Sequence, residues 1–267
     1  MDLTPFPDAF FVAEGDAFRS TELTRGPWSN EHQHAGPPAA LLACVLERGL
    51  PPAMAIARLT VEILRPIPIA TLRVATQALR TGRKVQWLTA DLLAADGATL
   101  ARAHAVCIRT AQLQLPVKGD SIADPVPAPA DSQPFQFDFF SSDVGYQTGM
   151  EARLARGTLG KGPVSMWMRM RAPLIAGEAP SPVQRVMIAA DSGNGVSQVL
   201  DPRQFTFVNP DLTVYLHRPP AGEWVCLDAR TIPQERGIGL ADTRLLDEQG
   251  PIGRSVQSLL IDSRATS

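Results

Sequence analysis

The chain of 267 residues lacks the features that mark several large classes of protein. Its formal charge is −2 and it has no basic stripe, which argues against a nucleic-acid partner. No apolar run approaches the roughly 18 residues of a membrane-spanning helix, so we expect no membrane span. The start, MDLTPFPDAFFVAEGD, has no cationic segment followed by a long apolar run, and predicts no signal peptide. The cysteines are few, scattered and odd in number, which favours a reduced, cytoplasmic chain: Cys44, Cys107 and Cys226.

Several kinds of catalytic machinery are also absent. The sequence has no GxSxG, so it gives no support to the strained serine turn of an α/β-hydrolase. It has neither a Walker loop nor a GxGxxG following a predicted strand, and we predict no cofactor. His32 and His34 have a spacing that suits two metal ligands, but no cluster of cysteines or carboxylates joins them. We therefore predict no metal site.

A motif that occurs twice is the most informative feature present. Residues 59–66 are LTVEILRP and residues 212–219 are LTVYLHRP, with five of eight positions identical. Gly97 and Gly250 follow at the same distance, each in a turn between two alternating segments that predict a hairpin. Self-similarity at a fixed interval predicts a duplicated domain.

The duplication divides the chain into two halves of ordinary domain size. Residues 116–134 contain five prolines and no aromatic residue, and predict an extended linker without strand or helix. The predicted domains are thus 1–115 and 135–267, with the linker between them.

Each half contains one helix pattern followed by strand patterns. The first helix is predicted from Pro37 to Gly49, and the second from Ser181 to Asp191 with an interruption at 192–195. The fold class is therefore α+β, with a helix on an antiparallel sheet in each half. The predicted strands are 59–64, 74–79, 85–93 and 101–108 in the first half, and 212–217, 225–231, 237–246 and 254–261 in the second.

Polar residues that only one half contains are candidates for chemistry. Aligning the glycines of His34-Ala35-Gly36 and Asp191-Ser192-Gly193 places His34 opposite Asp191. Aligning the last strands places Gln257 opposite Ala105. Each polar residue also has a purely structural interpretation: a cap or loop residue for Asp191 and His34, and a surface residue for Gln257.

The second copy of the motif carries a polar face. Asn209, Asp211, Thr213, Tyr215 and His217 have the same parity, so they are predicted to share one face of the sheet. Such a face is usually only solvated. Here it accompanies the other polar features of the second half.

Together these pieces resemble the acyl-CoA thioesterase II (TesB-like) family of double-hotdog thioesterases. The resemblance covers most of the chain in family order, except the linker and residues 135–171. The matching segments are Trp28 to Leu42, Leu59 to Pro68, Ala189 to Gly195, Asn209 to Trp224 and Gly253 to Ile261.

The resemblance implies two hotdog folds, each a long helix wrapped by a curved antiparallel sheet. It also implies hydrolysis of an acyl-CoA substrate without a covalent intermediate, and a homodimer. The implied holders of the attacking water are Asp191, Gln257 and either Asn209 or Thr213. The implied substrate contacts are His34, Gly36, Gly193 and Gly195.

These residue types suit thioester hydrolysis. A thiolate leaves readily, because its pKa is close to the ~8.5 of a free cysteine. The reaction then needs a base, a positioned water and donors for the carbonyl oxygen, which Asp191, Gln257 and the backbone of residues 192–195 would supply. Two alternatives stay open. One is a non-catalytic acyl-CoA or lipid-binding protein. The other is an enoyl-CoA hydratase, which the absence of a His about five residues after Asp191 disfavours.

Overall fold

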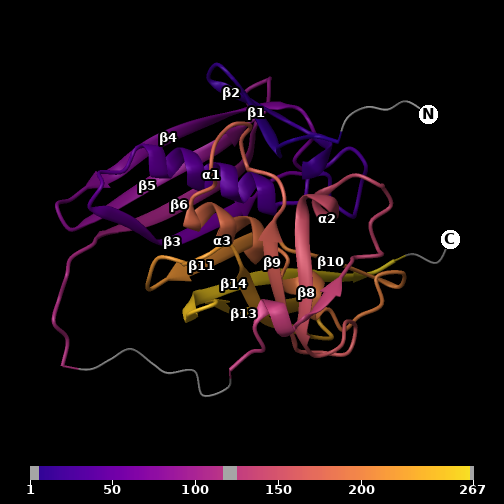
Figure 1. Cartoon of the computed structure of the whole chain (residues 1–267). Coiled ribbons are helices and arrows are strands. Elements are labelled where there is room, and N and C mark those ends of the chain that lie inside the picture. The colour runs from indigo at the N-terminus through magenta and orange to yellow at the C-terminus, as the bar shows by residue number, and fades with distance from the viewer. Residues whose placement is uncertain (1–5, 117–124, 265–267) are drawn as a thin grey trace.

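The computed structural model describes residues 6–116 and 125–264, and it contains one antiparallel sheet of fourteen strands (Figure 1). The first half contains β1 (Phe11–Glu14), β2 (Ala17–Ser20), η1 (Glu22–Thr24), α1 (Gly36–Arg48), β3 (Met54–Ile63), β4 (Thr71–Thr81), β5 (Val85–Leu93) and β6 (Thr99–Arg109). The second contains η2 (Pro129–Asp131), β7 (Gln133–Phe135), α2 (Tyr146–Gly149), β8 (Met150–Arg156), β9 (Val164–Met170), α3 (Pro182–Ala190), α4 (Gly193–Ser197), β10 (Phe205–Val208), β11 (Asp211–Leu216), β12 (Val225–Pro233), β13 (Ile238–Asp247) and β14 (Gly250–Ser263).

The order of strands shows that the two halves are built alike. It runs β1-β2-β4-β5-β6-β3 in the first half and continues β11-β14-β13-β12-β9-β8-β7, with β10 beside β14. Read outward from the junction, β3, β6, β5 and β4 correspond to β11, β14, β13 and β12. The duplication predicted from the repeated motif is therefore present in the topology.

The repeated motif forms the junction between the halves. β3 pairs with β11 so that Thr60 lies opposite Thr213, and their hydroxyl groups hydrogen-bond at 3.1 Å. These two residues are equivalent positions of the repeat, so a pseudo-two-fold axis passes between them. The motif thus joins the two sheets edge to edge into one.

The two longer helices pack side by side in opposite directions (Figure 1). A Cβ on Gly36, at the start of α1, would lie 2.4 Å from the carbonyl oxygen of Ile188 near the end of α3. At the other end of α1, Arg48 makes an ion pair with Glu178 ahead of α3 at 2.6 Å. The start of each helix therefore lies against the end of the other. The helices cover buried apolar residues of the sheet, which form one core across both halves.

The structure confirms all eight predicted strands and changes two other expectations. Part of the expected linker lies outside the described residues, and its remainder contains η2 and the start of β7, which pairs with β8. The interruption at 192–195 is mostly the short helix α4. Asp191 is the C-terminal cap of α3, where the predicted second helix ends, and it stands just before α4.

The two junction strands differ at one point that matters for the site. In β3 the register shifts between Ile56 and Arg58, which leaves Ala57 as a bulge in a continuous strand. The corresponding residue of the second half is Pro210, where the chain breaks into β10 and β11. Proline has no N–H for the ladder, so the pleat of β11 does not continue into Asn209.

Candidate active site

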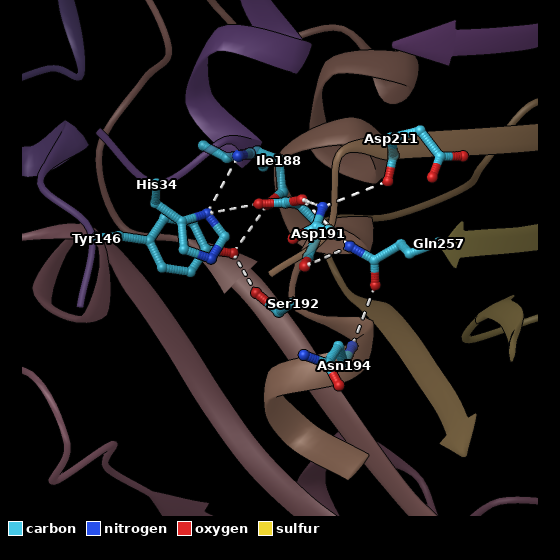
Figure 2. A network of polar contacts seen from close by, with 10 residues as sticks. His34, Tyr146, Ile188, Asp191, Ser192, Asn194, Asp211 and Gln257 are labelled. Atoms are coloured by element: carbon cyan, nitrogen blue, oxygen red, sulfur yellow. Dashed lines mark hydrogen bonds and ion pairs between the residues drawn. The ribbon is translucent and has the colours of Figure 1, made fainter. Parts of the chain in front are cut away.

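Asp191 lies at the centre of a polar network in the core (Figure 2). The residue is 7% exposed. Its Oδ1 accepts hydrogen bonds from Asn209 Nδ2 at 2.8 Å and Gln257 Nε2 at 3.2 Å, and its Oδ2 lies 3.1 Å from His34 Nδ1. A buried carboxylate is costly unless polar partners surround it, and these three side chains supply them. The site therefore draws on α3, the break before β11, β14 and the loop that precedes α1.

Gln257 holds Asp191 from the inner face of β14. It is 1% exposed, which excludes the surface role that its sequence context allowed. Besides the carboxylate, its Nε2 donates to the Asp191 main-chain oxygen at 3.0 Å, and its Oε1 accepts from the Asn194 N–H at 3.1 Å. β14 pairs with β11 in the register by which β6 pairs with β3, so Ala105 is the counterpart of Gln257, as the strand alignment predicted.

Of the two candidates for the third polar residue, the structure brings only Asn209 to Asp191. Thr213 lies opposite Val256 on β14, which places it on the face of the sheet away from Gln257, and its hydroxyl bonds Thr60. The parity argument placed Asn209 on that same outer face. It was wrong there because the strand breaks at Pro210, which lets Asn209 turn inward.

His34 and Tyr146 form the wall beside Asp191. Their rings stack with centroids 3.8 Å apart and planes 1° from parallel. The Tyr146 hydroxyl donates to the Ile188 carbonyl oxygen at 2.8 Å and also contacts Ser192 Oγ at 2.8 Å. Burial raises the pKa of Tyr146, so its hydroxyl stays protonated and the ring is fixed on the end of α3.

His34 Nδ1 lies between the Asp191 carboxylate and the start of α1. Burial lowers the pKa of His34, while the nearby Asp191 opposes that shift by raising it. His34 Nδ1 faces both Asp191 Oδ2 and the N–H of Gly36, which lies 3.1 Å away. A neutral ring nitrogen either carries a proton or offers a lone pair. With its proton on Nδ1 the ring donates to Asp191, and with its proton on Nε2 the Nδ1 lone pair accepts from the Gly36 N–H.

His34 was expected to be the counterpart of Asp191 across the repeat, and the structure corrects this. The two residues touch, because the pseudo-two-fold places the start of α1 against the end of α3. At the opposite ends of the same helices the start of α3 meets the end of α1, where the side chains of Ser181 and Glu47 hydrogen-bond at 2.6 Å. Glu47 is therefore the acid at the helix end equivalent to the one that carries Asp191.

Two of the predicted substrate contacts have another role. Gly36 is required by the close approach of α1 to α3, as described above. A Cβ on Gly193 would lie 2.7 Å from Thr243 Oγ1 and 3.2 Å from Gln257 Oε1, so Gly193 allows α4 to pack on the sheet. Neither lines the adjacent cleft, whereas His34 and Gly195 do.

Asp191 opens onto a cleft of about 420 Å³. Its wall is rich in aromatic side chains, and Arg65 lies on it, exposed and with no side-chain partner within the described ranges. The counterpart of Arg65 in the repeat is Arg218, which differs in making an ion pair with the buried Asp247. The aromatic lining residues are Trp28, Phe137, Phe139, Phe140, Tyr146 and Phe207.

Sequence reasoning missed Tyr146 and the phenylalanines of residues 137–140. They lie in the segment that carried no recognised motif. The aromatic density of FQFDFF was an available signal for an apolar wall, whereas nothing local distinguishes Tyr146. Within residues 6–116 and 125–264, no three His, Cys, Asp or Glu side chains are placed to hold a metal ion. In that same part of the chain, no helix is long and apolar enough to cross a membrane.

The topology and the site define a hotdog-fold protein with an acidic centre between its halves. Comparison with solved structures supports the fold. A hotdog-fold protein of unknown function from Alicyclobacillus acidocaldarius gives a TM-score of 0.74 at 17% identity, covering 97% of this chain and 98% of that one. A putative thioesterase from Novosphingobium aromaticivorans gives 0.72 at 19% identity, with 96% and 99% covered. The acyl-CoA thioesterase II TesB2 from Mycobacterium marinum gives 0.67 at 16% identity, with 96% and 95% covered.

The sequence itself matches the two domains of one family. The acyl-CoA thioesterase N-terminal domain matches residues 24–110, and the acyl-CoA thioesterase C-terminal domain matches residues 122–261. The chain belongs to the acyl-CoA thioesterase family and is a thioester hydrolase by that membership. No curated protein sequence matches it.

Proposed function

We propose that the chain hydrolyses acyl-CoA to a free carboxylic acid and CoA, with Asp191 activating water and no covalent intermediate. The observation that carries this proposal is the Asp191 carboxylate, which Asn209, Gln257 and His34 fix at the wall of an aromatic cleft. A carboxylate offers about four acceptor positions, and three contacts leave room for a water from the cleft. The amide groups of Asn209 and Gln257 donate to the Asp191 carboxylate itself. They therefore orient the base and do not hold the water directly.

The proposed step needs one water for each thioester. Its oxygen attacks the thioester carbonyl carbon while its proton passes to Asp191. The resulting oxyanion collapses, the carbon–sulfur bond breaks, and CoA leaves as a thiolate that takes up a proton. The Gly195 N–H is the candidate oxyanion donor: Gly195 lines the cleft, and that N–H makes no hydrogen bond within the described residues. The other amides of α4 are less suitable, since that of Asn194 is bonded to Gln257.

His34 stabilises both protonation states of the base in this scheme. While Asp191 is ionised, His34 Nδ1–H donates to it. After Asp191 takes the proton of water, His34 can accept from it. The stack on Tyr146 holds the imidazole in place during that exchange.

The direct test of this function is thiol release from acyl-CoA substrates of increasing chain length. We expect release of CoA, with the acyl chain in the aromatic part of the cleft. If the protein binds acyl-CoA by calorimetry but releases no thiol, it is the non-catalytic binder. An Asp–His pair also suits addition of water to an enoyl-CoA. The same assay separates that alternative, because hydration consumes the enoyl group without releasing a thiol.

Arg65 is the proposed contact for the phosphates of CoA. Replacing it by Gln removes the charge but keeps a polar side chain. We expect KM for acyl-CoA to rise about tenfold, the equivalent of about 1.4 kcal/mol, with little change in kcat. The matched substrate is the same acyl group on N-acetylcysteamine, which has no phosphate and whose KM should not change. An equal rise in KM for both substrates would contradict the assignment.

A cytoplasmic location and a homodimer stay predictions. The three cysteines are buried free thiols, as a reducing compartment would keep them. Light scattering coupled to size-exclusion chromatography would determine the oligomeric state.

A further inference from the structure

A second cleft of about 490 Å³ lies at the other end of the helix pair. It is the pseudo-symmetric counterpart of the first. The two strands of the junction supply corresponding residues to both: Phe207, Val208 and Pro210 line the first cleft where Met54, Ala55 and Ala57 line the second. The ends of the motif do the same, since Ile63 to Pro66 line the first cleft and Leu216 to Pro219 the second. The duplication has therefore produced two clefts of similar size and construction.

The second cleft lacks the groups that fix the base in the first. Glu47 takes the place of Asp191, but Ala105 replaces Gln257 and the buried Ile56 replaces Asn209. Glu47 has hydrogen bonds with the side chains of Ser181, at 2.6 Å, and Gln184. Both partners lie at the start of α3, so this carboxylate lacks the amides from the sheet that orient Asp191 toward its cleft. Loss of such positioning costs about 100-fold or more in rate, so this cleft is built to bind rather than to hydrolyse.

The lining of the second cleft indicates the chemistry of its ligand. Most of it is apolar, with Leu50, Ile56, Ile108, Val183 and Leu216 among the contributors. Its polar groups are few, as in sites for small apolar ligands. Burial raises the pKa of Glu47, so the acid keeps its proton to higher pH and can donate to a carbonyl or carboxylate oxygen. At the rim Arg109 is exposed and has no side-chain partner within the described residues.

We propose that the second cleft is a non-catalytic site for an acyl chain that carries an anionic head group. Both the acyl-CoA substrate and the carboxylic acid product have this chemistry, so the inference rests on the proposed function. The chain would then bind one ligand in the first cleft, where it is hydrolysed, and another in the second cleft, where it is not. The residue of the second half that is equivalent to Arg109 is Ile261. A positive charge at this position therefore occurs only in the non-catalytic cleft.

Calorimetric stoichiometry tests the proposal on the full chain. The probe is S-dodecyl-CoA, a thioether that cannot be hydrolysed. We expect two sites per chain in the wild type. Ala55→Trp should fill the second cleft and leave only the site in the first. The matched Val208→Trp, at the equivalent position, should fill the first cleft and leave only the site in the second. Ala55→Ser, a small replacement, should retain both. Dodecanoate in place of the thioether tells whether the second cleft takes the free acid, the acyl-CoA or both.

Activity measured on the same samples separates the two claims. Ala55→Trp should leave CoA release from dodecanoyl-CoA within about twofold of the wild type, which also shows that the variant is folded. Arg109→Gln, an exposed change, should weaken the second site about tenfold without affecting the first. One site in the wild type for each probe, unchanged in Ala55→Trp and Arg109→Gln, would overturn the proposal even if hydrolysis is normal. Absence of CoA release with two sites intact would overturn only the proposed function.

Discussion

Asp191→Asn is expected to lower the rate of CoA release by about 10²–10⁴-fold, the usual contribution of a general base. The amide has the size of the carboxylate but cannot take a proton from water. The effect should appear in kcat rather than in KM, since the shape of the cleft is unchanged. The measurement is thiol release at saturating acyl-CoA, with binding of a thioether analogue measured on the same variant.

A matched carboxylate provides the control for Asp191. Glu47 occupies the equivalent place in the other half, so Glu47→Gln makes the same chemical change outside the catalytic cleft. Its rate of CoA release should stay close to that of the wild type. Equal losses in both variants, or normal turnover by Asp191→Asn, would contradict the assignment of the base.

Gln257→Ala is expected to lower CoA release by about 100-fold, the scale of a small misplacement of a catalytic group. This side chain makes three of the contacts that hold Asp191 and α4 in place. Its loss leaves the Asn194 N–H and the Asp191 carbonyl with one partner fewer in a buried place. We therefore also expect the free energy of unfolding to fall by about 1–3 kcal/mol, measured by urea denaturation.

Two further variants separate the effect of Gln257 on the position of Asp191 from its effect on stability. Gln257→Glu keeps the length and one acceptor oxygen for Asn194, but it puts a second acid beside Asp191. Activity should fall while the Asn194 contact survives. Ala105→Gln, in the other half, changes the core without touching the site. If Gln257→Ala destabilised the fold yet kept full activity at low temperature, Gln257 would be structural alone.

The fold could be predicted largely because the two halves repeat the same local patterns. Alternating residues such as those around Thr60 and Thr213 define strands, and the matching hairpins define their order. The position of the seam was not evident, because sequence identity does not show that equivalent strands pair with each other. The helix relation was wrong for a similar reason. Aligning the glycines matched Gly36, at the start of α1, with Gly193, after the end of α3, and so compared opposite ends of the two helices.

The site was predictable where a residue's chemistry stands out against its context. Asp191 and Gln257 are polar groups in apolar surroundings, and the structure brings them together. Thr213 and Asn209 could not be distinguished from the sequence. The alternation of faces along the strand stops at Pro210, and only the structure shows that the strand breaks there. His34 was noted, but its contact with Asp191 depends on the antiparallel packing of two helices from different halves. Tyr146 is held by contacts that no short pattern encodes.

The most direct test of the central claim is a single turnover in H₂¹⁸O with enzyme in excess over acyl-CoA. If Asp191 activates water for direct attack, the product acid carries one ¹⁸O, and the peptide that contains Asp191 stays unlabelled. Enzyme quenched during turnover should carry no acyl group. An unlabelled product together with ¹⁸O in the Asp191 peptide would show that the carboxylate itself attacked the thioester, and would contradict the account.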